Sequence, residues 1–153
     1  MRSIALTLLV LSPTIGLCYD EFREDFDSVD GWVARPDWLG ARAEKPELSG
    51  REGIARFSIG EPNKGMKWRL ATDDLDPDMA PWLVLRYRAE NYAADRADYV
   101  LWAGGSGEGT KLLLGDKLIA DGGWHVQAIE LTAAGLKPPI TAFALQCFAA
   151  DVV

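Results

Sequence analysis

The sequence predicts an all-β protein, an antiparallel β-sandwich folded as one domain. Short stretches rich in strand-forming residues alternate along the chain with clusters of Gly, Pro and Asp. No stretch carries the 3.6-residue period of a long amphipathic helix. The 153 residues suffice for one domain, and 48% hydrophobic with 25% charged residues is the composition of a folded chain.

Charge and rare residues exclude several classes of function. The net charge is −7 and no basic block is present, so we expect no nucleic-acid partner, since phosphate contacts need clustered Lys and Arg. Two cysteines cannot form a disulfide framework or a four-cysteine zinc site. A single histidine, His125, argues against His-based metal or triad chemistry.

Residues 1–18 have the layout of a secretory signal peptide, which leaves 19–153 as the single domain. Arg2 gives a positive start, Ile4 to Leu11 is apolar apart from one threonine, and residues 12–18 are more polar. The apolar run is far below the ~20 residues that span a bilayer, so we expect no stable membrane span. The predicted location is secreted or periplasmic. The alternative interpretation is a buried N-terminal helix or strand.

The cleavage site of this leader and the state of Cys18 each have more than one interpretation. Cleavage after Gly16 or after Cys18 fits equally, because both residues are small. A lipid anchor on Cys18 is a further alternative, although Leu17 fits a lipobox poorly. If Cys18 stays, it has Cys147 as a partner for a disulfide; otherwise Cys147, within an apolar run, is a small core residue.

The strands follow from local patterns of strand-forming residues between turns. Alternation in one of them separates an inner face of Leu83, Leu85 and Tyr87 from an outer face with arginines. In chain order the expected strands are Ile54 to Ile59, Met66 to Ala71, Trp82 to Arg88, Asp98 to Ala103, Lys111 to Leu114, Lys117 to Ala120, Trp124 to Leu131 and Ile140 to Phe148. In the strand Trp124 to Leu131, the alternation of Trp124, Val126 and Ala128 is out of step with Ile129 and Leu131, and a bulge near Ala128 would reconcile them. The stretches 93–97 and 132–136 suit single helical turns.

Four parts of the sequence share the pattern of one family. They are Phe22 to Asp27 with Gly31 and Trp32, Lys67 to Arg69 before Asp74 and Leu75, Ala120 to His125 before Ile129 to Leu131, and the late strand Ile140 to Phe148. Together they resemble secreted β-jelly-roll domains of the galactose-binding-like, carbohydrate-binding-module type. The resemblance covers Glu21 to Asp151. It implies a further C-terminal strand, and since the sequence stops at Val153 we expect a C-terminally incomplete sheet with an exposed edge.

The resemblance implies a polysaccharide or oligosaccharide ligand, and aromatic side chains are the natural candidates to contact it. Sugar-binding sites stack the C–H face of a pyranose on aromatic rings. Of six tryptophans, Trp38, Trp82 and Trp102 are the candidates for exposed positions, whereas Trp32, Trp68 and Trp124 suit the core. Arg86 and Arg88, on the outer face of their strand, suit hydroxyls or a uronate carboxylate; a solvated face paired with acidic neighbours is the alternative.

A second candidate site is the acidic turn made by Asp73, Asp74, Asp76 and Asp78. Oxygen ligands of this kind suit Ca²⁺. Met79 and Leu85 stand where an EF-hand loop needs Gly and Glu, so an EF-hand is excluded. A structural calcium of another geometry and a plain polar turn are the two remaining interpretations.

The sequence predicts a secreted, non-catalytic carbohydrate-binding domain rather than an enzyme. No nucleophile elbow, zinc-protease motif or dinucleotide fingerprint is present, and the glycine-rich stretch Gly104 to Lys111 lacks the ending of a phosphate loop. No cofactor is expected beyond the calcium considered above. Two alternatives stay open: a structural or protein-interaction module of a larger extracellular protein, and a small glycan-active hydrolase or lyase with paired carboxylates.

Overall fold

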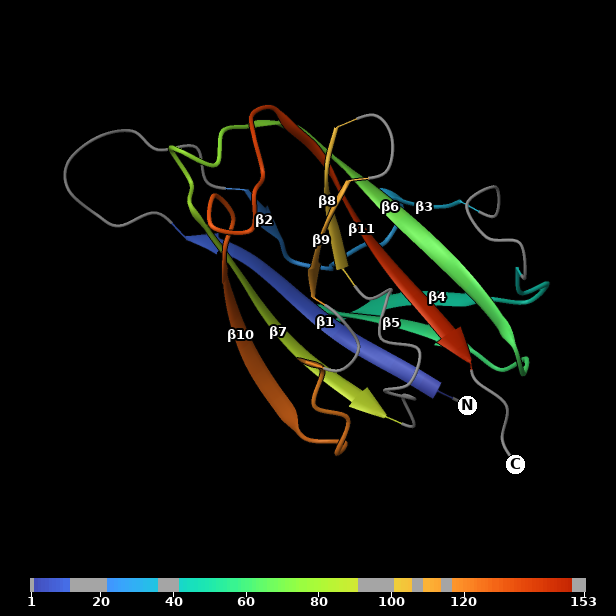
Figure 1. Cartoon of the computed structure of the whole chain (residues 1–153). Helices are drawn as coiled ribbons and strands as arrows, with labels where there is room; N and C mark the ends of the chain where they lie inside the picture. Colours follow the sequence, from blue (N-terminus) through green and yellow to red (C-terminus); the bar gives the residue numbers. More distant parts are fainter. Residues whose placement is uncertain are drawn as a thin grey trace.

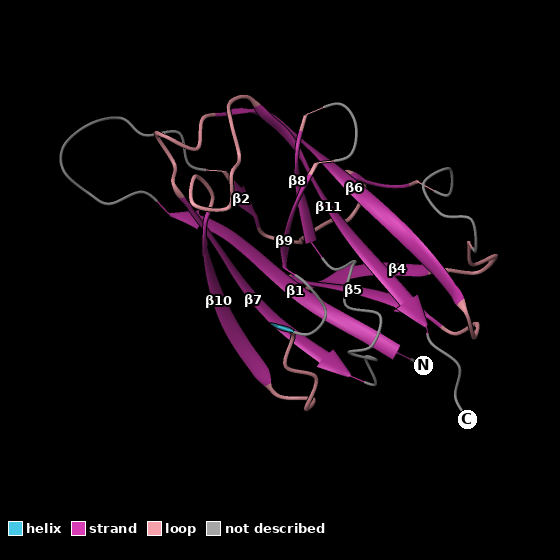
Figure 2. Cartoon of the chain, in the orientation of Figure 1, coloured by secondary structure: helices cyan, strands magenta, loops and turns pink. Residues whose placement is uncertain are grey.

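The computed structural model describes residues 2–11, 22–35, 42–90, 101–105, 109–113 and 117–149. In these ranges the chain forms two β-sheets, one of six strands and one of five. Every pairing between named strands is antiparallel. Figures 1 and 2 show strands joined by turns, with a short helical turn at Lys117 coloured cyan in Figure 2. No helix of the described part is long and apolar enough to cross a membrane. The predicted all-β antiparallel sandwich is thus confirmed at the level of fold class.

The first sheet has the strand order β10-β7-β1-β5-β4, with β2 also paired to β1. Its members are β1 (Arg2–Leu11), β2 (Arg23–Glu24), β4 (Glu47–Arg51), β5 (Ile54–Ile59), β7 (Trp82–Glu90) and β10 (Trp124–Glu130). The second sheet has the order β3-β6-β11-β8-β9. Its members are β3 (Trp32–Ala34), β6 (Lys64–Leu75), β8 (Leu101–Gly104), β9 (Thr110–Leu113) and β11 (Ile140–Ala149).

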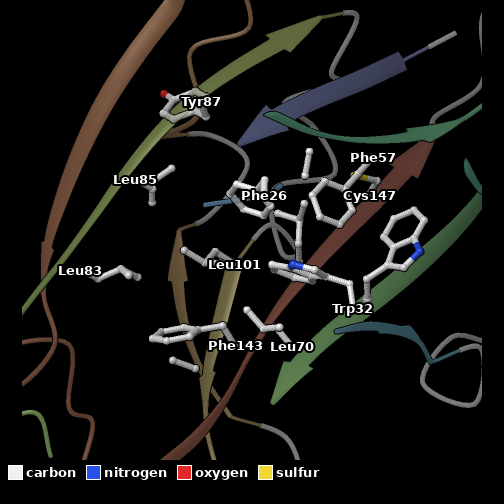
Figure 3. Packing of buried hydrophobic residues seen from close by; sticks show 14 of the residues in the cluster. Phe26, Trp32, Phe57, Leu70, Leu83, Leu85, Tyr87, Leu101, Phe143 and Cys147 are labelled. Carbon is white, nitrogen blue, oxygen red and sulfur yellow. The ribbon is translucent and has the colours of Figure 1, made fainter. Parts of the chain in front are cut away.

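The core lies between the sheets and is built from the alternate residues that each strand turns inward (Figure 3). An aromatic group joins its two sides: the ring of Phe57 on β5 lies 5.1 Å from Trp32 and 5.3 Å from Trp68, in edge-to-face geometry. Phe26 stacks on Trp32, with the two ring centres 6.0 Å apart. Trp32 and Trp68 are buried, as their sequence context predicted.

The N-terminal segment Arg2–Leu11 is a central strand of the first sheet, between β5 and β7. Its register with β7 is unbroken from Ser3 opposite Glu90 to Leu11 opposite Trp82. In the structure this segment is therefore a strand, which is the alternative interpretation given above for residues 1–18. Removal of the segment by a signal peptidase stays a prediction.

Several expected elements differ from the observed ones. Lys117 to Ala120 is not a strand: Leu118 is buried, and the Ile119 N–H donates a hydrogen bond to the Tyr87 hydroxyl at 3.1 Å. The strand expected over Met66 to Ala71 continues to Leu75, because pairing with β11 extends that far. The residues 132–136 form a tight turn closed by backbone hydrogen bonds, and 93–97 lie outside the described residues.

Candidate functional site

The outer face of β7 carries large exposed side chains because the strand alternates strictly. Leu83, Leu85 and Tyr87 point into the core and are essentially fully buried. The intervening side chains Arg86 and Arg88 are exposed, and Trp82 at the start of the strand is 40% exposed. The alternation predicted for this strand is confirmed, and Trp82 lies at the surface as expected.

β10 lies beside β7 and turns a second tryptophan to the same side. Trp124 is 37% exposed and Val126 is 68% exposed, whereas His125 is partly buried toward the core. The prediction that Trp124 belongs to the core is wrong, since the inner face of this strand is set by His125, Gln127 and Ile129. The predicted bulge near Ala128 is also absent, because β10 and β7 keep one register throughout.

The register of β7 and β10 joins these side chains into one surface. Trp124 lies opposite Arg88, and Val126 lies opposite Arg86. The guanidinium carbon of Arg86 lies 4.3 Å from the centre of the Trp124 ring, which is cation–π geometry. We call this surface the Trp–Arg face; its members are Trp82, Val84, Arg86, Arg88, Trp124 and Val126.

A tight turn fixes Trp124 at the start of β10. Gly122 has φ +79°, a conformation that glycine adopts without strain, and its N–H donates to the carbonyl of Ala89 at 3.1 Å. One carboxylate oxygen of Asp121 accepts the Gly123 N–H at 2.7 Å and lies 2.8 Å from His125 Nε2. These contacts with His125 and Gly123 lower the pKa of the Asp121 carboxyl below its ordinary value.

The arginines of the Trp–Arg face differ in their partners. Arg88 forms an ion pair with Glu90 two residues along β7. Arg86 lies on the Trp124 ring instead. The two guanidinium groups therefore have different neighbours, and both stay exposed at the surface.

Trp102, the third predicted ligand-binding tryptophan, lies on the outer face of the other sheet and is only 7% exposed. The ammonium of Lys67 lies 3.9 Å from the centre of its ring. The expectation that Trp102 is exposed is therefore wrong. Trp38 lies outside the described residues.

A small hollow opens beside Trp102 on this second outer face. Its volume is about 20 Å³, which is room for one water or one small chemical group. Arg69 and Lys67 border it, and the small residues Ala142 and Ala144 of β11 form part of its lining. Sequence reasoning missed this hollow, because it depends on which strands lie next to one another.

The acidic turn does not assemble a cation site in the described residues. Asp73 and Asp74 belong to β6, whereas the Asp76 carboxylate accepts the Asp78 N–H at 2.9 Å and so closes the turn that follows. Nowhere in the described ranges do three or more His, Cys, Asp or Glu side chains gather closely enough to hold a metal ion. The calcium prediction gains no support from this geometry.

Cys147 has no environment that would activate it as a nucleophile. Its thiol is free and lies on the inner face of β11, opposite Met66. Burial raises the pKa of this thiol to about 12, so it stays protonated at neutral pH. Cys147 is thus a core residue, as one of the sequence interpretations had it.

The described residues form an antiparallel β-sandwich on which Trp82, Arg86, Arg88 and Trp124 make an exposed aromatic and cationic surface. No family model, curated protein or solved structure matches this chain. The resemblance to galactose-binding-like domains therefore stays a prediction.

Proposed function

We propose that the protein binds an oligosaccharide or polysaccharide on the Trp–Arg face, without catalysing a reaction. The observation that supports this best is the gathering of two exposed tryptophans and two exposed arginines on one sheet surface. Indole rings offer apolar faces for stacking against a sugar ring, and guanidinium groups donate to hydroxyls or to a uronate carboxylate. Export from the cell, predicted from residues 1–18, is part of the proposal.

The spacing along β7 favours an elongated ligand. Trp124 lies opposite Arg88, which is six residues from Trp82 on the same strand. At about 3.3 Å per residue the two tryptophans are roughly 20 Å apart along the strand. A ligand that contacts both must span several sugar rings, so we expect chains to bind better than monosaccharides.

The cation–π contact gives one part of this surface a fixed orientation. Arg86 covers one face of the Trp124 ring, so the ring and the guanidinium form a unit held before ligand arrives. Because the ring is already ordered, the protein loses less conformational entropy when a ligand binds to it. We expect Trp124 to contribute more to affinity than its exposure alone implies.

A glycan-array screen of the full chain, followed by titration calorimetry with the best polysaccharide, tests the proposal. Trp82→Ala and Trp124→Ala should each weaken binding about tenfold, the cost of one lost aromatic contact. Val33→Ala is the matched control, because Val33 is 58% exposed on β3 of the other sheet. A chelator should leave the affinity unchanged.

Failure of the folded chain to bind any glycan, or wild-type affinity in both tryptophan variants, would overturn the proposal. A partner protein captured on the same face, and lost in the Trp124→Ala variant, would instead support the interaction-module alternative. Exposed Val126 is the feature of the Trp–Arg face that suits such a partner.

A further inference from the structure

The strand between β5 and β7 is central to the first sheet, and the segment that forms it also has the features of a leader that is removed. β1 occupies this position and is antiparallel to both neighbours. On one side β1 pairs with β7 from Ser3 to Leu11; on the other side it pairs with β5 over residues 2–6 and with β2 at Leu8 and Leu9 (Figure 1). Without it, β5 and β7 would stand two strand spacings apart, about 9.5 Å, each with a row of unpaired backbone groups.

On the inner side of the sheet, every second residue of a strand in this position faces the core, which favours aliphatic side chains there. Residues directly opposite in neighbouring strands share a face of the sheet. Positions 4, 6, 8 and 10 lie opposite Ala89, Tyr87, Leu85 and Leu83, all of which are buried. On the other side, positions 4 and 6 lie opposite the buried residues Phe57 and Ala55. A segment shifted by one residue would bring its other set of side chains to the core.

The outer side of the position has positive charge on both flanks. Position 5 lies opposite Arg56 on β5 and also opposite Arg88 on β7, and position 7 lies opposite Arg86. All three arginines are exposed. The chain's own residues there, Ala5 and Thr7, are uncharged. Opposite charges across strands are favourable, so acidic residues at these two places would fit better than the native ones.

We propose that the position between β5 and β7 is a binding site for an extended segment of another polypeptide, with aliphatic residues at every second position and acidic residues between them. The segment adds as a strand antiparallel to both neighbours, which is recognition by β-augmentation. The proposal rests on removal of the leader, which belongs to the proposed function, and it shares Arg86 and Arg88 with the Trp–Arg face. Residues 2–11 fill the site until they are cleaved.

The test begins from the full chain, folded, with a specific protease site placed in residues 12–18 and then cut. Three labelled peptides compete with the resident segment: RSIALTLLVL, its Ala5→Glu, Thr7→Glu form, and a form with one residue inserted to invert the alternation. Fluorescence anisotropy should show exchange of the first peptide and about three- to 150-fold tighter binding of the second, the gain of three cross-strand charge pairs with Arg56, Arg86 and Arg88. The third should not bind.

Arg56→Gln in the cut chain is the matched control, because Arg56 lies outside the Trp–Arg face. It should reduce the preference for the acidic peptide and leave the affinity for RSIALTLLVL within about twofold. Equal binding of the inverted peptide, or an acidic preference unchanged by Arg56→Gln, would overturn the proposal. So would retention of residues 2–11 in the exported protein, seen by intact mass, or exchange of the segment only between copies of this chain.

A second measurement covers the case in which the cut segment does not leave. In the intact chain, Ala5→Glu should raise the thermal unfolding temperature, and Ala5→Lys should lower it. The opposite order would overturn the charge preference that defines the partner. Intact mass and glycan titration of the same samples keep a failure of this proposal separate from a failure of glycan binding.

Discussion

The two outer faces of the sandwich carry the same kind of group in opposite environments. On the first sheet, Arg86 lies over Trp124 and both are exposed; on the second, Lys67 lies over Trp102 and both are buried. The contacts are alike in geometry, at 4.3 Å and 3.9 Å from the ring centres. An aromatic–cation pair therefore does not by itself mark a binding surface. Exposure decides whether such a pair can meet a ligand or supports the fold.

The largest expected effect separates the two tryptophans by stability. Trp102→Ala removes a buried ring and should lower the free energy of unfolding by about 3–5 kcal/mol. Trp124→Ala removes a ring that is already 37% exposed and should cost about 1 kcal/mol. Urea unfolding followed by circular dichroism measures both. Equal losses would contradict the distinction drawn between the two faces.

A smaller effect concerns Gln146, which lies on the covered outer face opposite Lys67. Gln146 is 1% exposed, and its side-chain nitrogen has no hydrogen-bond partner within the described part of the chain. Because a buried unsatisfied donor is costly, Gln146→Met should raise stability by about 1 kcal/mol. Thermal unfolding measures the change, with Val126→Thr on the exposed face as a control that should stay within about 0.5 kcal/mol. A loss of stability in Gln146→Met would show that the amide is satisfied by other groups.

The smallest effect is the pH dependence of the turn that positions Trp124. The pKa of Asp121 lies below its ordinary value of 3.8, since its carboxylate accepts hydrogen bonds from His125 and Gly123. A lowered folded pKa means that the stabilisation is complete above pH 3.8 and is lost as pH falls through the folded pKa. Thermal unfolding between pH 6 and pH 2 should show a shallower acid decline in Asp121→Asn than in the wild type. Identical slopes would contradict a stabilising role of the Asp121 carboxylate in this turn.

Local patterns in the sequence predicted much of the sandwich. The strand Ile54–Ile59 has the expected bounds, and β7 has the expected inner and outer faces. The first succeeds because strand-forming residues lie between turns, and the second because Leu83, Leu85 and Tyr87 alternate with Val84, Arg86 and Arg88. The leader prediction for residues 1–18 rests on a positive start, an apolar run and a more polar end, and such a run lacks the two-residue period that predicts a half-buried strand.

The candidate site was only partly predictable. Trp82, Arg86 and Arg88 were expected on the surface, and they lie there. Trp124 was missed, since Trp124, Val126 and Ala128 look like an inner face until the pairing with β7 shows which parity meets the core. Trp102 fails for the converse reason: it lies on an outer face, and that face is buried around Trp102 although it is exposed at Val33. Burial of an outer face depends on contacts between distant segments, which residue patterns do not contain.

The central place of β1 has a consequence for the order of events during synthesis. Ser3 pairs with Glu90 and Leu11 with Trp82, so these partners are separated by 87 and 71 residues along the chain. At about 5–20 residues per second, a ribosome needs roughly 4–17 s to make the partner strand after the N-terminal segment has emerged. Contacts of such high sequence separation also form slowly. If residues 1–18 act as the predicted leader, we expect the export machinery to meet the apolar segment during that interval, before its partner strand exists.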